Sequence, residues 1–533
     1  MEVLSEEVTR ISAELAERPD PAYWVNVSAY DVTRLRLVAA NGVTIAPERS
    51  HRREADVDVR VGSPALDHTH KIRDAGWFED EPKDTVFLPV DGDDRATRLA
   101  IWRATDDAYR QAQKRLLKVR ANLAVKVESE DASPDFSSAP VARDLRPART
   151  IELDVPEWRA RLARVSAQAL DYADVHESNI SLDAIASTRV IVNSEGTHLV
   201  LPRAVYVLSL SVNTTAEDGA ALQVYESILA SEPGELPTED DLSETFNEMV
   251  DRLAALRDAP VAEPTTAPAI LRGRAAAVFF HEVLGHRIES HRQRDDDEGQ
   301  TFKDMVGEPI LPAFMNVTDD PTLIERDGVR LHGHYSYDDE GVAAQRVEVV
   351  RDGILRNFLT SRTPIEGFPA SNGHGRRQPG HMVVSRQGNL LIEATETVSE
   401  DTLRRKLMAE IRAQGKPYGF IIDDITGGFT FTGRSTPNAF VVKPVGIVRV
   451  WADGRPDELI RGADLIGTPL VAFSQVLAAS DQVAIFNGYC GAESGYVPVS
   501  ASAPDLLLGE LEIQRGDKAH DRPPLLPTPG FDQ

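Results

Sequence analysis

The sequence has almost no cysteine and no long apolar run. Only 1 of its 533 residues is cysteine, which excludes an intrachain disulfide framework and any metal site built from cysteine alone. No apolar segment approaches the roughly 20 residues that a membrane-spanning helix needs. Met1 is followed by Glu-Val-Leu-Ser-Glu-Glu, not by a basic stretch and an apolar core, so we expect no signal peptide. These absences predict a cytoplasmic protein with no membrane partner.

Positive charge is also scarce. The chain has 58 Lys and Arg residues against 85 Asp and Glu residues, a formal net charge of −27. Such a surface repels phosphate backbones, so we expect no nucleic-acid partner. With 41% hydrophobic and 27% charged residues, the composition is that of a globular protein long enough for two cored domains.

A proline-rich segment divides the chain. Residues 258–268 contain three prolines and no apolar periodicity, which is typical of a linker or an extended crossing segment. The sequence therefore predicts an N-terminal domain (1–257) and a C-terminal domain (269–533). The fold class is predicted as α+β: an N-terminal α/β domain with helices and hairpins, then a β-rich domain carrying the metal-site helix.

Apolar spacing predicts the main elements of both domains. Expected helices are Glu2–Arg18, Arg95–Ala121, Glu157–Asp171, Asp240–Arg257, Arg272–Arg292 and Glu400–Gln414. Expected strands after the linker include Gln345–Val350, His381–Ser385, Leu390–Glu393, Ala439–Val442 and Gly446–Trp451. Lys443-Pro444 and Gly427-Gly428 are assigned to turns without chemistry.

One segment suggests a metal centre. An apolar helix runs into His281-Glu282 and, after three residues, His286. Two imidazoles can hold zinc through neutral nitrogens, and a neighbouring glutamate can take a proton from the attacking water.

The common zinc-peptidase motif has one residue fewer between the histidines. Five residues turn an ideal helix by about 500°, so both histidines can share a metal only if the helix ends, loosens or takes a π-like turn. Gly285 tolerates such a backbone. The alternative is a helix with two structural histidines.

A third ligand is needed, because catalytic zinc typically keeps three protein ligands and one open position. His291 is a candidate, although a solvated position farther along the helix is the stronger expectation. Cys490 is the other candidate, since it lies on a glycine-flanked turn where a thiolate can approach a cation closely. A lone cysteine is more often a small buried apolar residue, so that reading stays open.

Six ordered motifs in the C-terminal half resemble the TldD/PmbA metalloprotease family. They are His281-Glu-Val-Leu-Gly-His286, Gln300–Gly307, Asp338-Asp-Glu-Gly341, Ser371-Asn-Gly373 with Arg376-Arg377, Ala463–Gly467 and Gly488-Tyr-Cys490-Gly491. The resemblance implies a peptidase whose zinc is held by His281, His286 and Cys490, with Glu282 as the general base. It also implies a metal-bearing chain that forms a homodimer, or a heterodimer with a metal-free paralogue, around a cavity for unfolded or extended peptide. The sequence departs from the family in its Arg-Ile-Glu-Ser-His continuation and in an extra His374-Gly375, which puts substrate preference in doubt.

Other polar groups have weaker assignments. Asn372, Arg376 and Arg377 lie in a glycine-rich loop and are candidates for binding a peptide carbonyl or carboxylate, although ordinary surface arginines explain the pattern equally well. His332 and His334 are candidates for outer support of the zinc ligands. The carboxylates of Asp338-Asp339-Glu340 could bind a metal, but a solvated acidic turn is the stronger expectation.

The leading functional hypothesis is a zinc-dependent peptidase acting on unfolded or extended peptides or propeptides. Two alternatives use the same residues: a non-catalytic peptide-binding subunit with a structural zinc, and a zinc amidohydrolase acting on a non-peptide amide. A zinc deaminase is disfavoured, because the His-x-Glu and Pro-Cys-x-x-Cys elements are missing.

Overall fold

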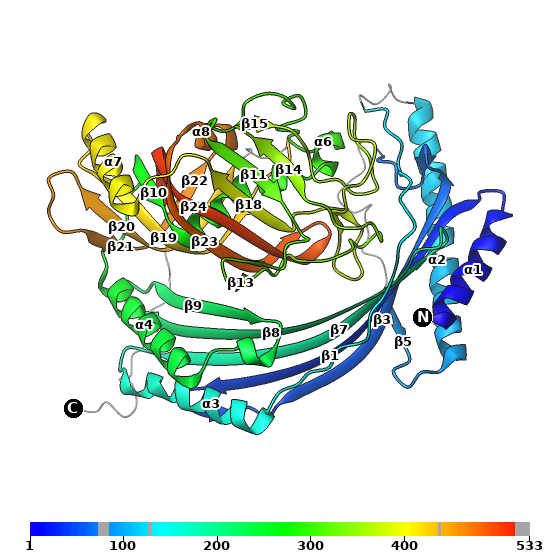
Figure 1. Cartoon of the computed structure of the whole chain (residues 1–533), viewed down its shortest axis with the longest axis horizontal. Helices are drawn as coiled ribbons and strands as arrows, with labels where there is room; N and C mark the ends of the chain where they lie inside the picture. The colour runs from blue at the N-terminus through cyan, green and yellow to red at the C-terminus, as the bar shows by residue number, and fades with distance from the viewer. Residues whose placement is uncertain (73–84, 126–130, 435–438, 517–533) are drawn as a thin grey trace.

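The protein is built from two large sheets, and the N-terminal sheet curves along one side of the C-terminal domain (Figure 1). This computed structural model describes residues 1–72, 85–125, 131–434 and 439–516. The predicted α+β fold class, with two sheet-rich domains, is confirmed. Among the described residues, no helix combines the length and apolar character needed to cross a membrane.

The N-terminal sheet has nine strands, with the order β4-β3-β1-β7-β8-β6 along its main path. Four long strands carry it in antiparallel register, as expected for alternating apolar hairpins. Its strands are β1 (Ala22–Ala40), β2 (Val43–Thr44), β3 (Glu48–Ser63), β4 (Leu66–Asp67), β5 (Val86–Leu88), β6 (Arg143–Leu145), β7 (Glu177–Asn193), β8 (His198–Thr215) and β9 (Ala221–Ala230).

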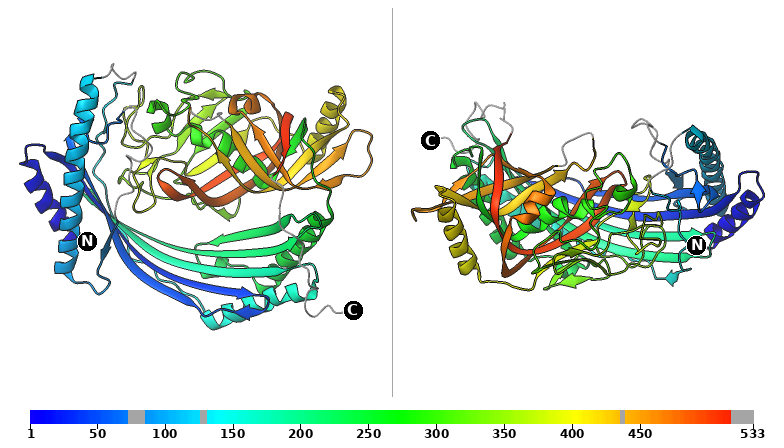
Figure 2. Two further views of the ribbon diagram at one scale, coloured as in Figure 1. Left: turned by 180° about the vertical axis from the view of Figure 1, so that it is seen from behind. Right: turned by 90° about the horizontal axis from the view of Figure 1, so that it is seen from above.

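Four helices cover this sheet, two at each end (Figures 1 and 2). α1 (Glu2–Ala16) packs on β1 and α2 (Asp94–Val125) on β3. At the other end, α3 (Val155–Ala167) packs on β1 and β7, and α4 (Glu239–Asp258) on β8 and β9. The sequence begins α4 with a capping box between Thr238 and Asp241. Its buried side chains recur at helical spacing: Leu242, Phe246, Met249, Val250, Leu253 and Leu256.

The C-terminal sheet has eleven strands, and β24 lies at its centre. β24 pairs with β10, β18, β22 and β23, and residues 497–508 are almost entirely buried, as a strand covered on both faces must be. The strands are β10 (Thr265–Leu271), β11 (Met315–Asp319), β14 (Val347–Arg351), β15 (Ile354–Leu355), β18 (Asn389–Ala394), β19 (Tyr418–Thr430), β20 (Phe440–Trp451), β21 (Glu458–Ile460), β22 (Ala463–Gly467), β23 (Val476–Ala492) and β24 (Gly495–Arg515).

Smaller elements complete this domain. Two short antiparallel pairs join β12 (Glu325–Arg326) to β13 (Val329–Arg330) and β16 (Gly375–Arg376) to β17 (Val384–Ser385). The helices are α5 (Gly273–Val283), α6 (His291–Arg294), α7 (Glu400–Ala413) and α8 (Pro469–Ser474). β10 begins inside the predicted linker 258–268, so the irregular segment between the two sheets is shorter than the proline pattern suggests. The domain boundaries otherwise stay a prediction.

Candidate metal centre

Helix α5 carries the first half of the site. Its residues 275–283 are all buried, because the helix is apolar and packs against β19, β23 and β24 of the C-terminal sheet. The helix ends at Val283, and a single 3-10 turn (Gly285–Arg287) follows. The predicted continuous helix Arg272–Arg292 is therefore wrong. His281 and His286 could share a metal only if the helix ended or loosened between them. It does, since α5 ends at Val283.

Gly285 is needed for a different reason from the one expected. Its φ is not positive, so the backbone there makes no demand for glycine. A Cβ atom on Gly285 would instead lie 1.9 Å from Oε1 of Gln387, far inside contact distance. The residue permits a close approach of the loop before β18 to the turn that holds His286.

Cys490 reaches the histidines from the other side of the domain. It lies near the end of β23, where its partner across the hairpin is Val497 of β24, and its side chain is buried. Its Sγ atom is 3.1 Å from Nε2 of His281 and 3.2 Å from Nε2 of His286. The three potential ligand atoms all lie within 4.8 Å of one another. The structure thus brings together the two histidines and the cysteine that sequence analysis singled out.

The charges of the cluster depend on one another. Burial by itself raises the pKa of the Cys490 thiol, but the adjacent His286 and His281 imidazoles bring the pKa well below the usual value. Burial likewise lowers the pKa of His281 and of His286. The Cys490 sulfur, together with the carboxylate of Glu282 beside His281 and that of Glu289 beside His286, outweighs burial, so both pKa values are raised. A thiolate between two imidazoles is a donor set that suits a cation replacing the imidazole protons.

Glu282 faces the same cluster. Its Oε2 atom is 4.0 Å from Nε2 of His286, and the side chain is only 9% exposed. Among the described residues, Oε2 has no hydrogen-bond partner although it is buried. Buried carboxylate oxygens are normally satisfied, so an unpartnered one at the edge of a ligand cluster indicates a role toward a bound group.

A glycine of β19 makes room for Glu282. A Cβ atom on Gly428 would lie 2.8 Å from Cγ of Glu282. The predicted turn at Gly427-Gly428 is wrong, since both residues lie within β19. Glycine inside a strand is a known sign of a close approach, and that signal was present in the sequence.

The donor set fits zinc. Two imidazole nitrogens and one thiolate are the ligand types that zinc prefers, and three protein ligands leave a position open. Nδ1 of His286 also lies 3.2 Å from Oε2 of Glu289, the kind of outer hydrogen bond that metal-bound histidines usually make.

The predicted substrate-binding residues are committed to contacts within the chain. Asn372 accepts a hydrogen bond from the backbone of Thr360 (2.8 Å) and donates one to the carbonyl of Phe358 (2.8 Å). Arg376 and Arg377 are buried, and this corrects the prediction that the three bind peptide. Arg376 donates to the carbonyl of Gln387 (2.6 Å), and Arg377 donates to both carboxylate oxygens of Asp58 (3.0 Å each).

The other candidate histidines lie outside the three-ligand cluster. Nδ1 of His291 is 2.9 Å from Oγ of Ser385, and Nε2 pairs with Glu493, so the side chain is neither solvated nor a ligand in this arrangement. His332 accepts a hydrogen bond from Arg203 (3.0 Å) and packs against Tyr489, the neighbour of Cys490. His334 donates to the carbonyl of Pro321 (2.9 Å).

The acidic turn is buried, contrary to expectation. Asp338, Asp339 and Glu340 are 1%, 7% and 4% exposed. Asp339 pairs with Arg189 of β7, and Glu340 accepts a hydrogen bond from the backbone of Arg362 (2.6 Å). The turn therefore ties the two domains together instead of facing solvent.

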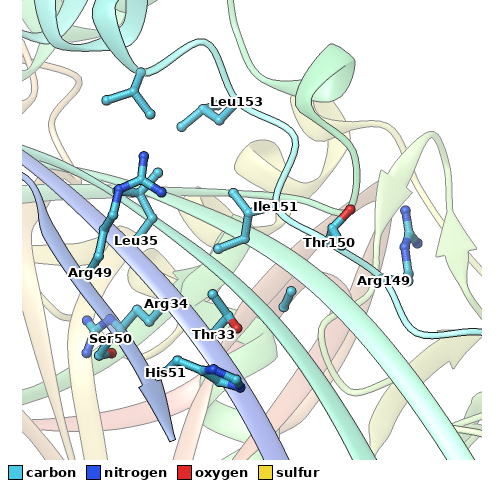
Figure 3. Close-up of a pocket in the computed structure, with 12 residues that line it drawn as sticks. Thr33, Arg34, Leu35, Arg49, Ser50, His51, Arg149, Thr150, Ile151 and Leu153 are labelled. Carbon is cyan, nitrogen blue, oxygen red and sulfur yellow. The ribbon is translucent and has the colours of Figure 1, made fainter. Parts of the chain in front are cut away.

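A cavity of about 540 Å³ lies on the N-terminal sheet, away from these residues (Figure 3). It is bordered by β1, β3, β7 and the segment 149–155, and several basic side chains line it, among them Arg49 and Arg149. It shares no residue with the ligand cluster, so its volume says nothing about the metal centre.

Comparison with known proteins relates the second half of the chain to metallopeptidases. Residues 264–515 match the family described as PmbA/TldA metallopeptidase C-terminal domain. A metalloprotease TldD homolog of Haemophilus influenzae is 27% identical over 254 residues, which cover 46% of this chain and 48% of the relative. A zinc metalloprotease TldD homolog of Saccharolobus solfataricus is 23% identical over 309 residues, which cover 57% and 64%. The chain spans about half the length of the first curated relatives it matches.

The fold agrees over almost the whole chain. TldE from Thermococcus kodakarensis superimposes with a TM-score of 0.59, covering 96% of this chain and 99% of that one at 13% identity. An identity this low shows a common fold only. The sequence match over residues 264–515 assigns the C-terminal domain of this chain to the TldD/PmbA metallopeptidase family.

Proposed function

We propose that this protein is a zinc-dependent peptidase that acts on unfolded or extended peptides. The observation that carries the proposal is the convergence of His281, His286 and Cys490 within 4.8 Å beside the buried carboxylate of Glu282. The name of the Saccharolobus relative, a zinc metalloprotease, supports the choice of metal. The metallopeptidase description of the family supports the choice of a peptide bond.

The roles of the residues follow from their chemistry. His281, His286 and Cys490 would hold the ion, which when bound supplies a Lewis acid for water and for the scissile carbonyl. Glu282 is positioned to accept a proton from the attacking water and to return it to the leaving amine. Its Oε2 atom is buried without a hydrogen-bond partner in the described part of the chain, so the atom is available for that proton.

The proposed function includes a dimeric assembly. We propose a homodimer, or a heterodimer with a metal-free paralogue, because the family resemblance implies a peptide cavity between two protomers. Sedimentation of the purified chain at micromolar concentration should show a species of twice 58.5 kDa for a homodimer. A single 58.5 kDa species, unchanged when candidate paralogues are added, would contradict both forms.

Glu282→Gln tests catalysis directly. The amide keeps the shape of the side chain but cannot accept a proton, so zinc should remain bound while hydrolysis is lost. General-base assistance is worth roughly 10²–10⁴-fold, so residual casein digestion should be at or below about 1%. The matched control is Glu366→Gln, the same change at an exposed glutamate of the same domain. Normal digestion by Glu282→Gln would sink the catalytic assignment.

Cys490→Ala separates the alternatives. Losing a soft anionic ligand should lower zinc occupancy together with activity. Zinc retained in full would remove Cys490 from the ligand set. Stoichiometric zinc in a wild-type protein that digests no peptide would favour a structural zinc in a peptide-binding subunit. Chelator-sensitive hydrolysis of a small amide, but not of casein, would favour an amidohydrolase.

A further inference from the structure

Glu289 is a fully buried carboxylate three residues after His286, and neither the metal nor the catalytic role uses it. Its Oε2 atom lies 3.2 Å from Nδ1 of His286 and accepts a hydrogen bond from Nε of Arg292 (3.0 Å). We propose that Glu289 is the positioning residue of the metal centre, holding His286 directly and the Cys490 strand through Arg386. This inference rests on the proposed zinc site.

The contact with His286 fixes which nitrogen faces the ligand cluster. With Nδ1–H donated to Glu289, the lone pair of the neutral ring is on Nε2, the atom that points at Cys490. His281 lacks this support, because its Nδ1 atom is buried without a hydrogen-bond partner among the described residues. The two histidines are therefore held unequally, and the orientation of His286 depends on Glu289.

The contact with Arg386 extends the support to the cysteine. Arg386 is fully buried, and its Nε atom is 3.4 Å from Oε1 of Glu289. The same guanidinium donates to the carbonyl of Cys490 (2.8 Å) and to Oγ of Ser494 (2.8 Å). A buried guanidinium is stable in place only if its charge is compensated, so Glu289 helps to keep Arg386 where it braces the end of β23.

Arg292 connects the network to a further point on the same hairpin. It donates to Oε1 of Glu298 (2.9 Å) and to Oε2 of Glu493 (2.9 Å), three residues after Cys490. Glu493 in turn pairs with His291. His291, the reserve candidate for third ligand, thus belongs to the support of the site.

Removal of the Glu289 carboxylate should weaken zinc binding. For Glu289→Ala we expect zinc affinity to fall by roughly 10–100-fold, the usual effect of losing an outer partner of a metal-bound histidine. Glu289→Gln should lose less, because its amide oxygen can still accept the Nδ1–H of His286 while offering no charge to Arg292 and Arg386. The visible spectrum of the cobalt-substituted protein should change in both variants, because it reports how the ligands are oriented.

The matched control is Asp319→Asn. Asp319 is also fully buried in the C-terminal domain and also pairs with a histidine, with Oδ1 lying 3.1 Å from Nε2 of His374, outside the ligand cluster. Its loss should lower the thermal midpoint of the metal-free protein without changing zinc affinity or the cobalt spectrum.

Zinc affinity is measured by competition with a chromophoric chelator on the full chain. Wild-type protein that binds no zinc would overturn the proposed function itself. Wild-type zinc binding with Glu289→Ala within twofold of it would overturn the inference alone. If Glu289→Ala does not fold, Glu289→Gln decides, and an affinity and cobalt spectrum equal to those of Asp319→Asn would overturn the inference.

Discussion

At the scale of single residues, Gly428 controls the space that Glu282 occupies. A Cβ atom there would lie 2.8 Å from Cγ and 3.2 Å from Oε1 of Glu282. Its neighbour Gly427 has nothing within 4 Å of the corresponding position. Successive residues of β19 point to opposite faces, so the two glycines form a natural pair of test and control.

Gly428→Ala should therefore displace the general base without touching a zinc ligand. The added methyl group forces the Glu282 carboxylate from its present position, and misplacing a catalytic group by about 1 Å can cost on the order of 100-fold. We expect casein digestion to fall by about 10–100-fold with zinc content unchanged. Gly427→Ala should stay within about twofold of wild type, and equal losses in the two variants would refute a specific effect on Glu282.

Residue types alone singled out His281 and His286, and the family resemblance added Cys490 to this candidate ligand set. The contacts of the loop arginines were not predictable from the sequence. A histidine next to a glutamate, in a chain with a single cysteine, leaves few kinds of metal site to consider. The expectation that Arg377 binds substrate used only its glycine-rich surroundings. Arg377 instead pairs with the carboxylate of Asp58, which is 319 positions away in the chain. No local sequence pattern predicts a partner at that distance.

At the scale of elements, helices with local signals were predicted closely. α4 runs from Glu239 to Asp258 against the expected 240–257, because the capping box at Thr238 and the apolar spacing are both local. α7 covers Glu400–Ala413 against the expected 400–414. Helix propensity and the spacing of apolar residues are enough to predict a helix whose ends are not changed by contacts with distant parts of the chain.

Elements shaped by distant contacts were predicted less well. The apolar pattern continues past Val283, yet α5 stops there and the following turn packs Gly285 against Gln387, about a hundred residues later. The expected strands Ala439–Val442 and Gly446–Trp451 form the single strand β20, and Pro444 is tolerated inside it where the register with β19 shifts. A proline in the sequence cannot by itself distinguish a turn from an irregular strand.

At the scale of the whole molecule, one buried and one partly buried ion pair join the two domains. Arg377 of the C-terminal domain pairs with Asp58 of β3, and Arg189 of β7 pairs with Asp339. The N-terminal sheet thus supplies both an acidic and a basic side chain to loops of the C-terminal domain. Breaking one partner of a buried pair is strongly destabilising, so we infer that the curved sheet and the C-terminal domain hold each other in place.

Asp338, in the buried acidic turn, makes the free energy of unfolding depend on pH in an unusual way. Burial, followed by the neighbouring charge of Glu340, raises the pKa of Asp338 from 3.8 to about 8. Burial raises the pKa of Glu340 as well, against the opposing effect of Arg362. Between about pH 4 and pH 8 the folded protein therefore holds a proton at Asp338 that the unfolded chain has released.

The sign of the effect follows from this difference. A raised carboxyl pKa stabilises the folded state below the unfolded pKa of 3.8, and that stability is lost as pH rises through the folded pKa of about 8. One extra bound proton lowers the free energy of unfolding by at most about 1.4 kcal/mol for each pH unit in this window. Asp338→Asn cannot titrate, so its curve of unfolding free energy against pH should fall less steeply than that of wild type.

Denaturant unfolding at a series of pH values from 5 to 8, chosen to lie inside this window, measures the two slopes. The absolute stability of Asp338→Asn is not the readout, because Asp338 also accepts hydrogen bonds from the backbone of Glu340, Val342 and Gly375, and the amide cannot match them all. Asp107→Asn, on the exposed face of α2, controls for the loss of one carboxylate. Parallel curves for wild type and Asp338→Asn would show that Asp338 is ionised in the folded protein. The buried acidic turn would then have to be held by its arginines alone.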